Sequence, residues 1–305
     1  MNIKRFIALF IVSVLVNAYF SFTRSASNTA RDRLDAAIAK SGGKFIYKDI
    51  FYNILTQNII ISHVSIQPPG AESFINIDEI VVRRIDLKNS IPHFLYCDIK
   101  GLKLDPTTFG NTGAATFASL GYTGPLSCDI STNYNFTFDK SQFTLQSLYT
   151  AKDVGSLRMD VSFGNIDFDA KQLPQTLALA SNITLLQAEI AYVDASLLAR
   201  LLKLEAAEKG VDVPTLKTTL AGQAEAFLEQ KQLPHTTSVV TALKQFIENP
   251  RQLTISLTPA MPVPLGEIGR AGSPEAVDRL LSLEVKSCPE PPRRPGPVRL
   301  DAGPP

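Results

Sequence analysis

Strict alternation of apolar and polar residues is the feature that most constrains the fold of this chain. Between 157 and 163, the apolar residues Leu157, Met159, Val161 and Phe163 alternate with Arg158, Asp160 and Ser162. Successive side chains of a β-strand point to opposite faces, so this period of two places one face on a core and the other in water. The same alternation over 134–138 and 166–168 predicts further strands, with a bulge or a turn at Gly164.

Short β-rich runs lie on both sides of this region. They fall at 45–47, 59–66 and 75–77, separated by turn residues such as 68–70, and at about 93–104, 122–130, 142–150 and 183–193. Among them, Gly110, Gly113, Gly121 and Gly124 indicate a surface loop without the spacing of a phosphate-binding loop. We therefore predict a domain of antiparallel β-sheet over 41–193.

The section that follows has helical periodicity. Apolar residues recur every three to four positions in three segments, which begin near Asp194, Pro214 and Pro234. Strands at 252–258 and 283–286, with a short helix between them, complete a predicted helical subdomain with closing strands over 194–286. The Pro-rich stretch beyond it predicts a disordered tail over 287–305.

An apolar run near the start of the chain predicts a membrane anchor. Lys4 and Arg5 precede the run, and no charged residue follows until Arg24. At about 17 residues the run reaches the lower limit for a spanning helix. The two positive residues orient the N-terminus towards the cytoplasm. We predict an anchor and juxtamembrane helix over 1–40, single-pass in the inner membrane, with the main body in the periplasm. Cleavage near Ala18 and secretion is the alternative.

Composition and motif spacing exclude several function classes. The 30 Lys and Arg residues nearly balance 29 Asp and Glu, so the net charge of +1 does not favour nucleic acid as a partner. The histidines His63, His93 and His235 stand singly, and the three cysteines form no CxxC pair. No dinucleotide-binding glycine motif or serine-hydrolase elbow is present either. We predict no catalytic, cofactor-binding or metal-binding residue.

Two cysteines form a candidate disulfide. Cys97 and Cys128 both lie in apolar, strand-like runs, whereas Cys288 begins the Pro-rich tail. Thiols outside the cytoplasm meet an oxidising compartment, where disulfides form and persist. Neighbouring strands bring the two Cα atoms within bonding range only in a suitable register, which the sequence does not give. Two free, buried thiols are therefore the alternative.

Three features of the chain are similar to those of one known family: the predicted anchor, the run 42–52 that leads into 61–66, and the segment 246–257. With them the chain resembles, diffusely over roughly 1–285, the AsmA/YdgA-like group of membrane-anchored bacterial envelope proteins. The resemblance implies a non-enzymatic protein that faces the envelope. In that group such proteins are tied to lipid or outer-membrane homeostasis.

Together, these features predict an α+β fold with an N-terminal membrane helix, a curved antiparallel β-sheet and a C-terminal helical subdomain. The expected function is to handle lipid or another apolar ligand, or to maintain the envelope. The alternative is a structural or interaction module of an envelope assembly that binds no lipid, and an enzyme ranks third. A continuous apolar trough favours lipid, whereas a filled core with one exposed apolar patch favours a protein partner.

Overall fold

The computed structural model describes residues 23–32, 34–35, 44–67, 74–86, 88–89, 92–166, 180–230 and 236–288. The predicted anchor before Thr23 and nearly all of the predicted tail lie outside these residues. Within the described part of the chain, no helix is both long and apolar enough to cross a membrane. The chain forms two compact units, which we call the N-terminal unit (Met1–Ala114 with Gly124–Asn135) and the C-terminal unit (Ala115–Thr123 with Phe136–Pro305).

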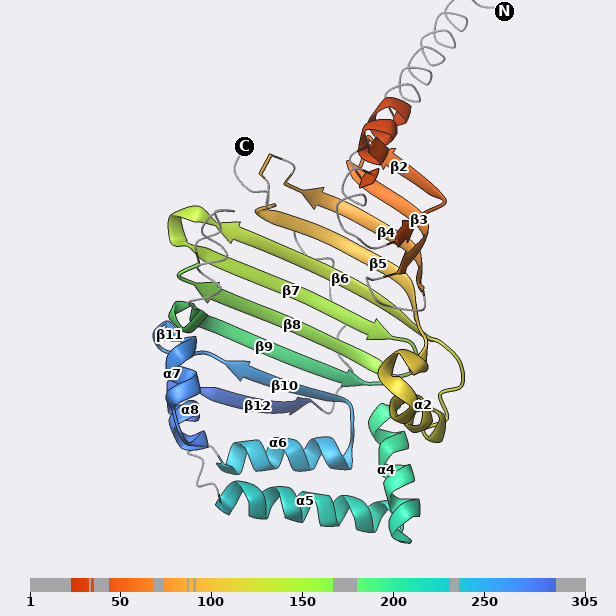
Figure 1. Cartoon of the computed structure of the whole chain (residues 1–305). Coiled ribbons are helices and arrows are strands. Elements are labelled where there is room, and N and C mark those ends of the chain that lie inside the picture. The colour runs from red at the N-terminus through yellow and green to blue at the C-terminus, as the bar shows by residue number, and fades with distance from the viewer. Residues whose placement is uncertain are drawn as a thin grey trace, which may run out of the picture. The chain divides into compact units, whose positions relative to one another are not determined.

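The N-terminal unit is built on an antiparallel sheet (Figure 1). Its strands are β1 (Lys44–Ile46), β2 (Asp49–Asn53), β3 (Asn58–Gln67), β4 (Ile75–Ile85), β5 (Phe94–Leu104) and β6 (Leu126–Thr137), the last of these up to Asn135. The strands pair in the order β1-β3-β4-β5-β6, and β2 also pairs with β3. Residues 23–32 and 34–35 are helical and form what we call the N-terminal helix.

One face of this sheet is apolar because the register aligns isoleucines across it. Ile50, Ile61, Ile80, Ile99 and Ile130 lie opposite one another on β2, β3, β4, β5 and β6. Directly opposed residues of an antiparallel pair share a face, so these side chains form one continuous row. Two of them, Ile50 and Ile61, are buried with Val64 and Ile77 in the core of the unit.

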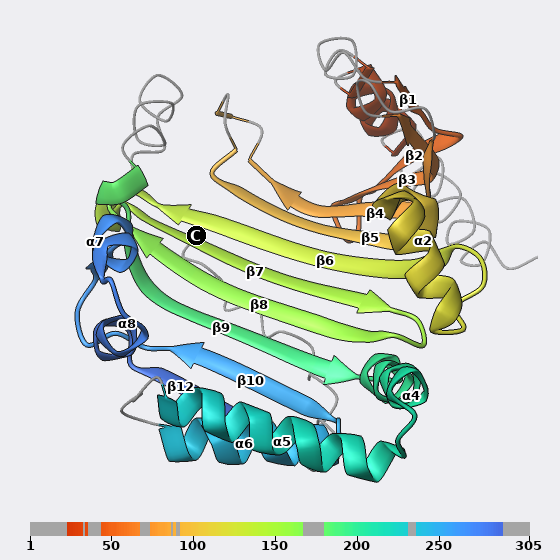
Figure 2. The same cartoon turned by 60° about the horizontal axis from the view of Figure 1, so that its bottom comes forward.

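The C-terminal unit combines further antiparallel strands with helices. Its strands are β7 (Gln142–Ala151), β8 (Gly155–Gly164), β9 (Thr184–Asp194), β10 (Gln252–Leu257), β11 (Val263–Pro264) and β12 (Leu283–Cys288). They pair in the order β7-β8-β9-β10-β12, with β11 on β9. Its helices are α4 (Leu197–Lys209), α5 (Val213–Gln230), α6 (Thr236–Glu248), α7 (Leu265–Arg270) and α8 (Pro274–Leu281). Single 3-10 turns lie at Phe138–Lys140 and Ala180–Asn182. Strand β9 bends along its length (Figure 2).

The predicted alternation over 157–163 is confirmed as β8. Met159 lies opposite Ser147 on β7 and Ile190 on β9, and Ile190 lies opposite Ile255 on β10. The other face carries polar pairs such as Asp160 opposite Glu189. The irregularity predicted near Gly164 is also present, as a shift in the β8–β9 register between Ser162 and Phe163.

Helices cover two ends of the apolar face in the C-terminal unit. Helix α6 lies along β10 and β12, with α5 beside it (Figure 2). Its residues Val239, Val240 and Ala242 are buried against Val285 of β12. Leu185 of β9, Val263 of β11 and Leu281 of α8 form a second core. Both cores are closely packed and consist mainly of valine and leucine side chains.

A polar cluster binds residues 115–123 into the C-terminal unit. The Tyr122 side chain is buried, and its hydroxyl lies 3.0 Å from Ser196 Oγ at the start of α4. The Arg200 guanidinium lies 4.4 Å from the centre of the Tyr122 ring and donates a hydrogen bond to the Leu120 carbonyl at 2.9 Å. A cation over an aromatic face and a hydrogen bond to the same segment fix its position.

The loop predicted from the glycines at 110–124 is confirmed only beyond Ser119, and the part before it is wrong. The chain there forms a 3-10 turn (Pro106–Phe109) and the helix α2 (Gly110–Ser119). Alanines within α2 favour helix, and the buried residues Leu120 and Tyr122 anchor the segment after it. Tertiary burial therefore outweighs the low helix propensity of the glycines.

The α+β fold class with antiparallel sheet is confirmed. The helices predicted after 193 are present as α4, α5, α6 and α8, and the closing strands as β10 and β12. The division into compact units falls elsewhere than the predicted boundary at 193, because β9 pairs with both β8 and β10. Strand pairing therefore places β7, β8 and β9 in one unit with the helices.

Candidate apolar binding site

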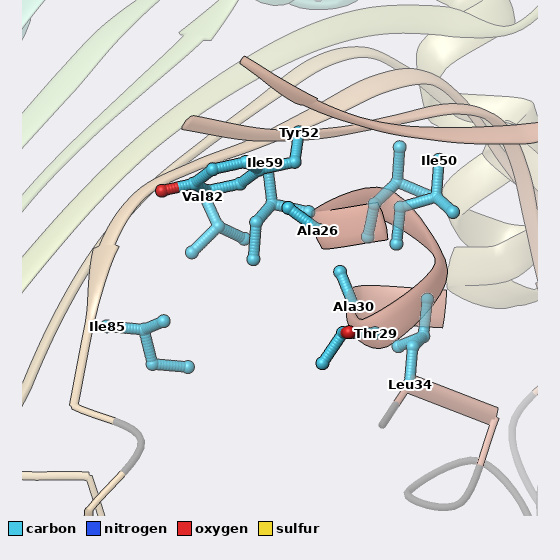
Figure 3. Close-up of a pocket in the computed structure, with 10 residues that line it drawn as sticks. Ala26, Thr29, Ala30, Leu34, Ile50, Tyr52, Ile59, Val82 and Ile85 are labelled. Carbon is cyan, nitrogen blue, oxygen red and sulfur yellow. The ribbon is translucent and has the colours of Figure 1, made fainter. Parts of the chain in front are cut away.

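A cavity of about 430 Å³ lies in the N-terminal unit, between the N-terminal helix and the apolar face of the sheet (Figure 3). Its lining residues come from four elements and are Ala26, Thr29, Ala30, Leu34, Ile50, Tyr52, Ile59, Ile61, Val82 and Ile85. Ligand sites commonly have volumes of about 300–1,000 Å³ and mostly apolar walls. The cavity therefore has the size and lining of a binding site for a small apolar ligand.

The helical wall follows from the spacing of small residues. Ala26, Thr29, Ala30 and Leu34 recur every three to four positions, so they lie on one face of the helix. Asn28 and other polar residues lie on the exposed face. Three of the four wall residues are small, which leaves space between this helix and the sheet.

Hydrogen bonds hold the helix against β2. Ser27 Oγ accepts a hydrogen bond from the Tyr52 backbone N–H at 2.8 Å, and it donates to the Thr23 carbonyl at 2.7 Å. Further along, the Tyr47 hydroxyl donates to Asp35 Oδ1 at 2.9 Å. Burial and this bond to Asp35 both raise the pKa of Tyr47 above its usual value, so the hydroxyl stays protonated as a donor. The wall is thereby fixed to an edge strand of the sheet.

The sheet side of the cavity comes from alternate positions on β2 and β3 and from two residues of β4. Ile50 and Tyr52 of β2 lie opposite Ile61 and Ile59 of β3, and Val82 of β4 lies opposite Ile59. Figure 3 shows Ile85, at the end of β4, across the open space from the Ala30 and Thr29 side chains.

The lining residues carry very little polarity. None of the ten is charged, and only Thr29 and Tyr52 have a hydroxyl group. The Thr29 hydroxyl already donates a hydrogen bond to the Ser25 carbonyl at 3.1 Å. An ion pair on the helix, Arg31 with Asp49 at 3.4 Å, joins two exposed side chains of the unit itself. The cavity therefore offers hydrocarbon contacts and almost no recognition of charge.

A buried carboxylate supports the strand end that carries Ile85. The Asp86 side chain accepts hydrogen bonds from Asn89 Nδ2 at 2.7 Å, from the Lys88 backbone N–H at 2.9 Å and from the His93 backbone N–H at 3.1 Å. These bonds, that of Asn89 first, lower the pKa of Asp86 to about 2. The carboxylate thereby fixes the described parts of the β4–β5 connection beside the cavity.

The two cysteines of the candidate disulfide lie on adjacent strands but not at facing positions. Cys97 of β5 lies opposite Thr132, and Cys128 of β6 lies opposite Leu102. Four residues along β6 correspond to about 13 Å, beyond the ~7 Å that a disulfide spans between Cα atoms. Both are free thiols, and burial raises the pKa of Cys97 to about 11. In this register, a bridge would require β6 to slide along β5.

The C-terminal unit also has an apolar strip, and part of this strip is exposed at the surface. Leu157, Met159 and Ile190 continue the apolar face between the two filled cores, and Ile190 is 39% exposed. Phe136, in contrast, is buried in a third core with Ile166 and Ile183. Among the described residues, no group of three or more His, Cys, Asp or Glu side chains is arranged to hold a metal ion.

The cavity was not predicted from the sequence, although its components were. The β-rich run 59–66 and the periodicity of Ala30 and Leu34 predict its walls separately. Only the docking of the helix on β2 shows that the small side chains leave space there. A run of small residues on an amphipathic helix that faces a bulky isoleucine row is the signal that indicates such a space.

The fold and the site define a two-unit α+β protein in which the antiparallel strands of each unit have one apolar face. A family model described as "Uncharacterized protein" matches residues 148–287, which lie within the C-terminal unit. No curated protein matches the chain.

Proposed function

We propose that this chain is a membrane-anchored envelope protein that binds lipid, or another apolar ligand, in the cavity of the N-terminal unit. In this proposal it is non-enzymatic. Residues 4–22 hold it in the inner membrane as a single span, and the main body lies in the periplasm. The observation that carries the proposal is the uncharged cavity of about 430 Å³.

The position of the cavity along the chain supports a membrane ligand. If the anchor ends at Phe22, the first cavity residue, Ala26, follows only four residues later. A fully extended chain of that length spans no more than about 14 Å. The cavity then lies close to the bilayer surface, where acyl chains are abundant.

An interaction module is the second candidate function, and the C-terminal unit favours it. Its apolar strip lies between filled cores and is partly exposed at Ile190. Phe227 of α5 is also exposed, at 59%. Exposed apolar surface of this kind on an otherwise packed unit is typical of protein contacts.

Native mass spectrometry of the full chain, extracted in detergent, tests the first candidate. We expect a co-purifying lipid on the wild-type protein and a reduced lipid load on Ala30→Leu, which fills the cavity. Asn28→Leu adds the same side chain on the exposed face of the helix and serves as the matched control. Equal lipid load on both variants would contradict lipid binding at this site.

The same spectra test the anchor. We expect the intact mass to include residues 4–22. A new N-terminus at Tyr19 would instead show cleavage after Ala18 and support the secreted alternative.

A further inference from the structure

We infer that the cavity binds a single hydrocarbon tail and leaves the headgroup of its ligand outside. This inference rests on the proposed function and specifies the class of ligand: an amphiphile with one unbranched acyl chain, such as a fatty acid or a lysophospholipid. Recognition then depends on the tail, with no requirement for a particular headgroup.

The walls of the cavity do not favour a polar headgroup inside it. A site that selects a headgroup places charged or hydrogen-bonding side chains against it, because a buried polar group without a partner is unfavourable. None of the ten lining residues is charged, and the Thr29 hydroxyl is already bonded to Ser25, so the Tyr52 hydroxyl is the one remaining polar side-chain group among these lining residues. A polar or ionic headgroup inside the cavity would therefore lose its water and gain almost nothing in return.

The size of the cavity limits the ligand to one hydrocarbon tail. At about 430 Å³, it lies near the lower end of the range for ligand sites, which limits the ligand to a slender group. Two acyl chains and their headgroup do not fit such a volume. The bulky side chains Ile59, Val82 and Ile85 close it on the sheet side.

The exposed helical wall lets the headgroup of the ligand remain in solvent. Thr29 lines the cavity and is also exposed, so the cavity opens to solvent along the helix. Beyond the cavity lining, Arg31 and Asp49 form an exposed pair with each other. A headgroup outside this opening lies in water and needs no dedicated partner from the protein.

The test uses the absence of tryptophan from the chain. Tyr52→Trp replaces one aromatic side chain of the lining with another and provides the single indole reporter. Its backbone N–H bond to Ser27 does not depend on the side chain. Amphiphiles with a brominated chain quench indole fluorescence on contact, so they are added to the full chain in amphipol and the quenching is titrated.

Tail recognition predicts how the affinity changes with chain length and headgroup. From brominated octanoate to hexadecanoate, the affinity should rise about fourfold for each methylene until the cavity is full. A carboxylate, a trimethylammonium and a maltoside on the same dodecyl chain should bind within about threefold of one another. A lysophospholipid with that chain should match them, whereas a diacyl lipid should bind at least about tenfold more weakly.

Two variants in the Tyr52→Trp background separate the failure of this inference from the failure of the proposed function. Ala30→Leu should lower the affinity at least about tenfold, and Asn28→Leu should leave it unchanged. Saturable quenching that responds to Ala30→Leu but depends on the headgroup more than on the tail would overturn the inference and leave the proposed function standing. No saturable quenching by any amphiphile, with equal signals from both variants, would overturn both.

Discussion

In each of the two units, a helix covers an apolar face of the sheet, and the side chains of the two covering helices differ in size. In both, an antiparallel sheet turns one apolar face towards a covering helix. In the C-terminal unit, Val239 and Val240 of α6 fill the space above β10 and β12. In the N-terminal unit, the covering helix presents the smaller side chains of Ala26 and Ala30, and a cavity remains. The difference shows that the covering helix, more than the sheet, decides whether an apolar face becomes a core or a site.

A charge placed in a filled core is expected to have the largest effect. Phe136 is 6% exposed and packs with Ile166 and Ile183, so Phe136→Asp buries a carboxylate without a partner. We expect a loss of more than about 4–5 kcal/mol and no folded C-terminal unit. Near-ultraviolet circular dichroism measures this loss.

The matched variant is Met159→Asp, on the half-buried strip of the same unit. We expect a loss of only about 1–3 kcal/mol, since part of the side chain can reach water. Its lipid load should equal that of the wild type, because the cavity lies in the other unit. Complete unfolding of this variant would show that the strip is a core, and a lower lipid load would place lipid on the strip.

Replacing an alanine by leucine in each covering helix, α6 and the N-terminal helix, should change the stability of the protein in opposite directions. Ala242 of α6 is buried in a filled core, so Ala242→Leu should overpack it and destabilise the protein by about 1–3 kcal/mol. Ala30→Leu enters the cavity and should stabilise by about 0.5–2 kcal/mol. Chemical denaturation of both variants measures the two signs. Destabilisation by Ala30→Leu would mean that the space is not available.

Acid should weaken the N-terminal unit through Asp86. The pKa of this carboxyl in the folded protein, about 2, lies below its ordinary value of 3.8, so the ionised form stabilises the fold. The stabilisation is fully present above the ordinary pKa and is lost as the pH falls from about 4 towards 2. The protection factors of the Lys88 and His93 amides, corrected for the intrinsic exchange rate at each pH, should fall over that range. Asp86→Asn, already weakened at neutral pH, should show a smaller change with pH.

The smallest effects are expected at the cysteines. In the folded protein, Cys97 should react slowly with a thiol reagent near neutral pH, because burial raises its pKa to about 11 and thiolate is scarce. After denaturation without reductant, Cys97 and Cys128 should both be counted as free thiols. A single free thiol, assigned to Cys288, would instead show that the two are bridged and that β6 has a different register.

The sequence predicts the elements of this fold better than their assembly. Alternation identifies β8 because its two faces differ sharply, and helical spacing identifies α4 to α6. The helix α2 is missed because glycine lowers the local propensity, and only the burial of Leu120 and Tyr122 compensates. The separation of Cys97 from Cys128 depends on the register and on a bulge between Ile99 and Leu102, which local patterns do not encode. The cavity depends on the docking of one helix, through bonds between residues 25 positions apart.

The cluster around Tyr122 has a consequence for the timing of synthesis. Its partner Arg200 lies 80 residues further along the chain than Leu120, to which it donates. At about 5–20 residues per second, the ribosome adds that length in roughly 4–16 seconds. For the time needed to add that length, residues 115–123 lack the Ser196 and Arg200 side chains that hold them in the folded unit. The packing of this segment in the C-terminal unit is therefore completed only after α4 has been synthesised.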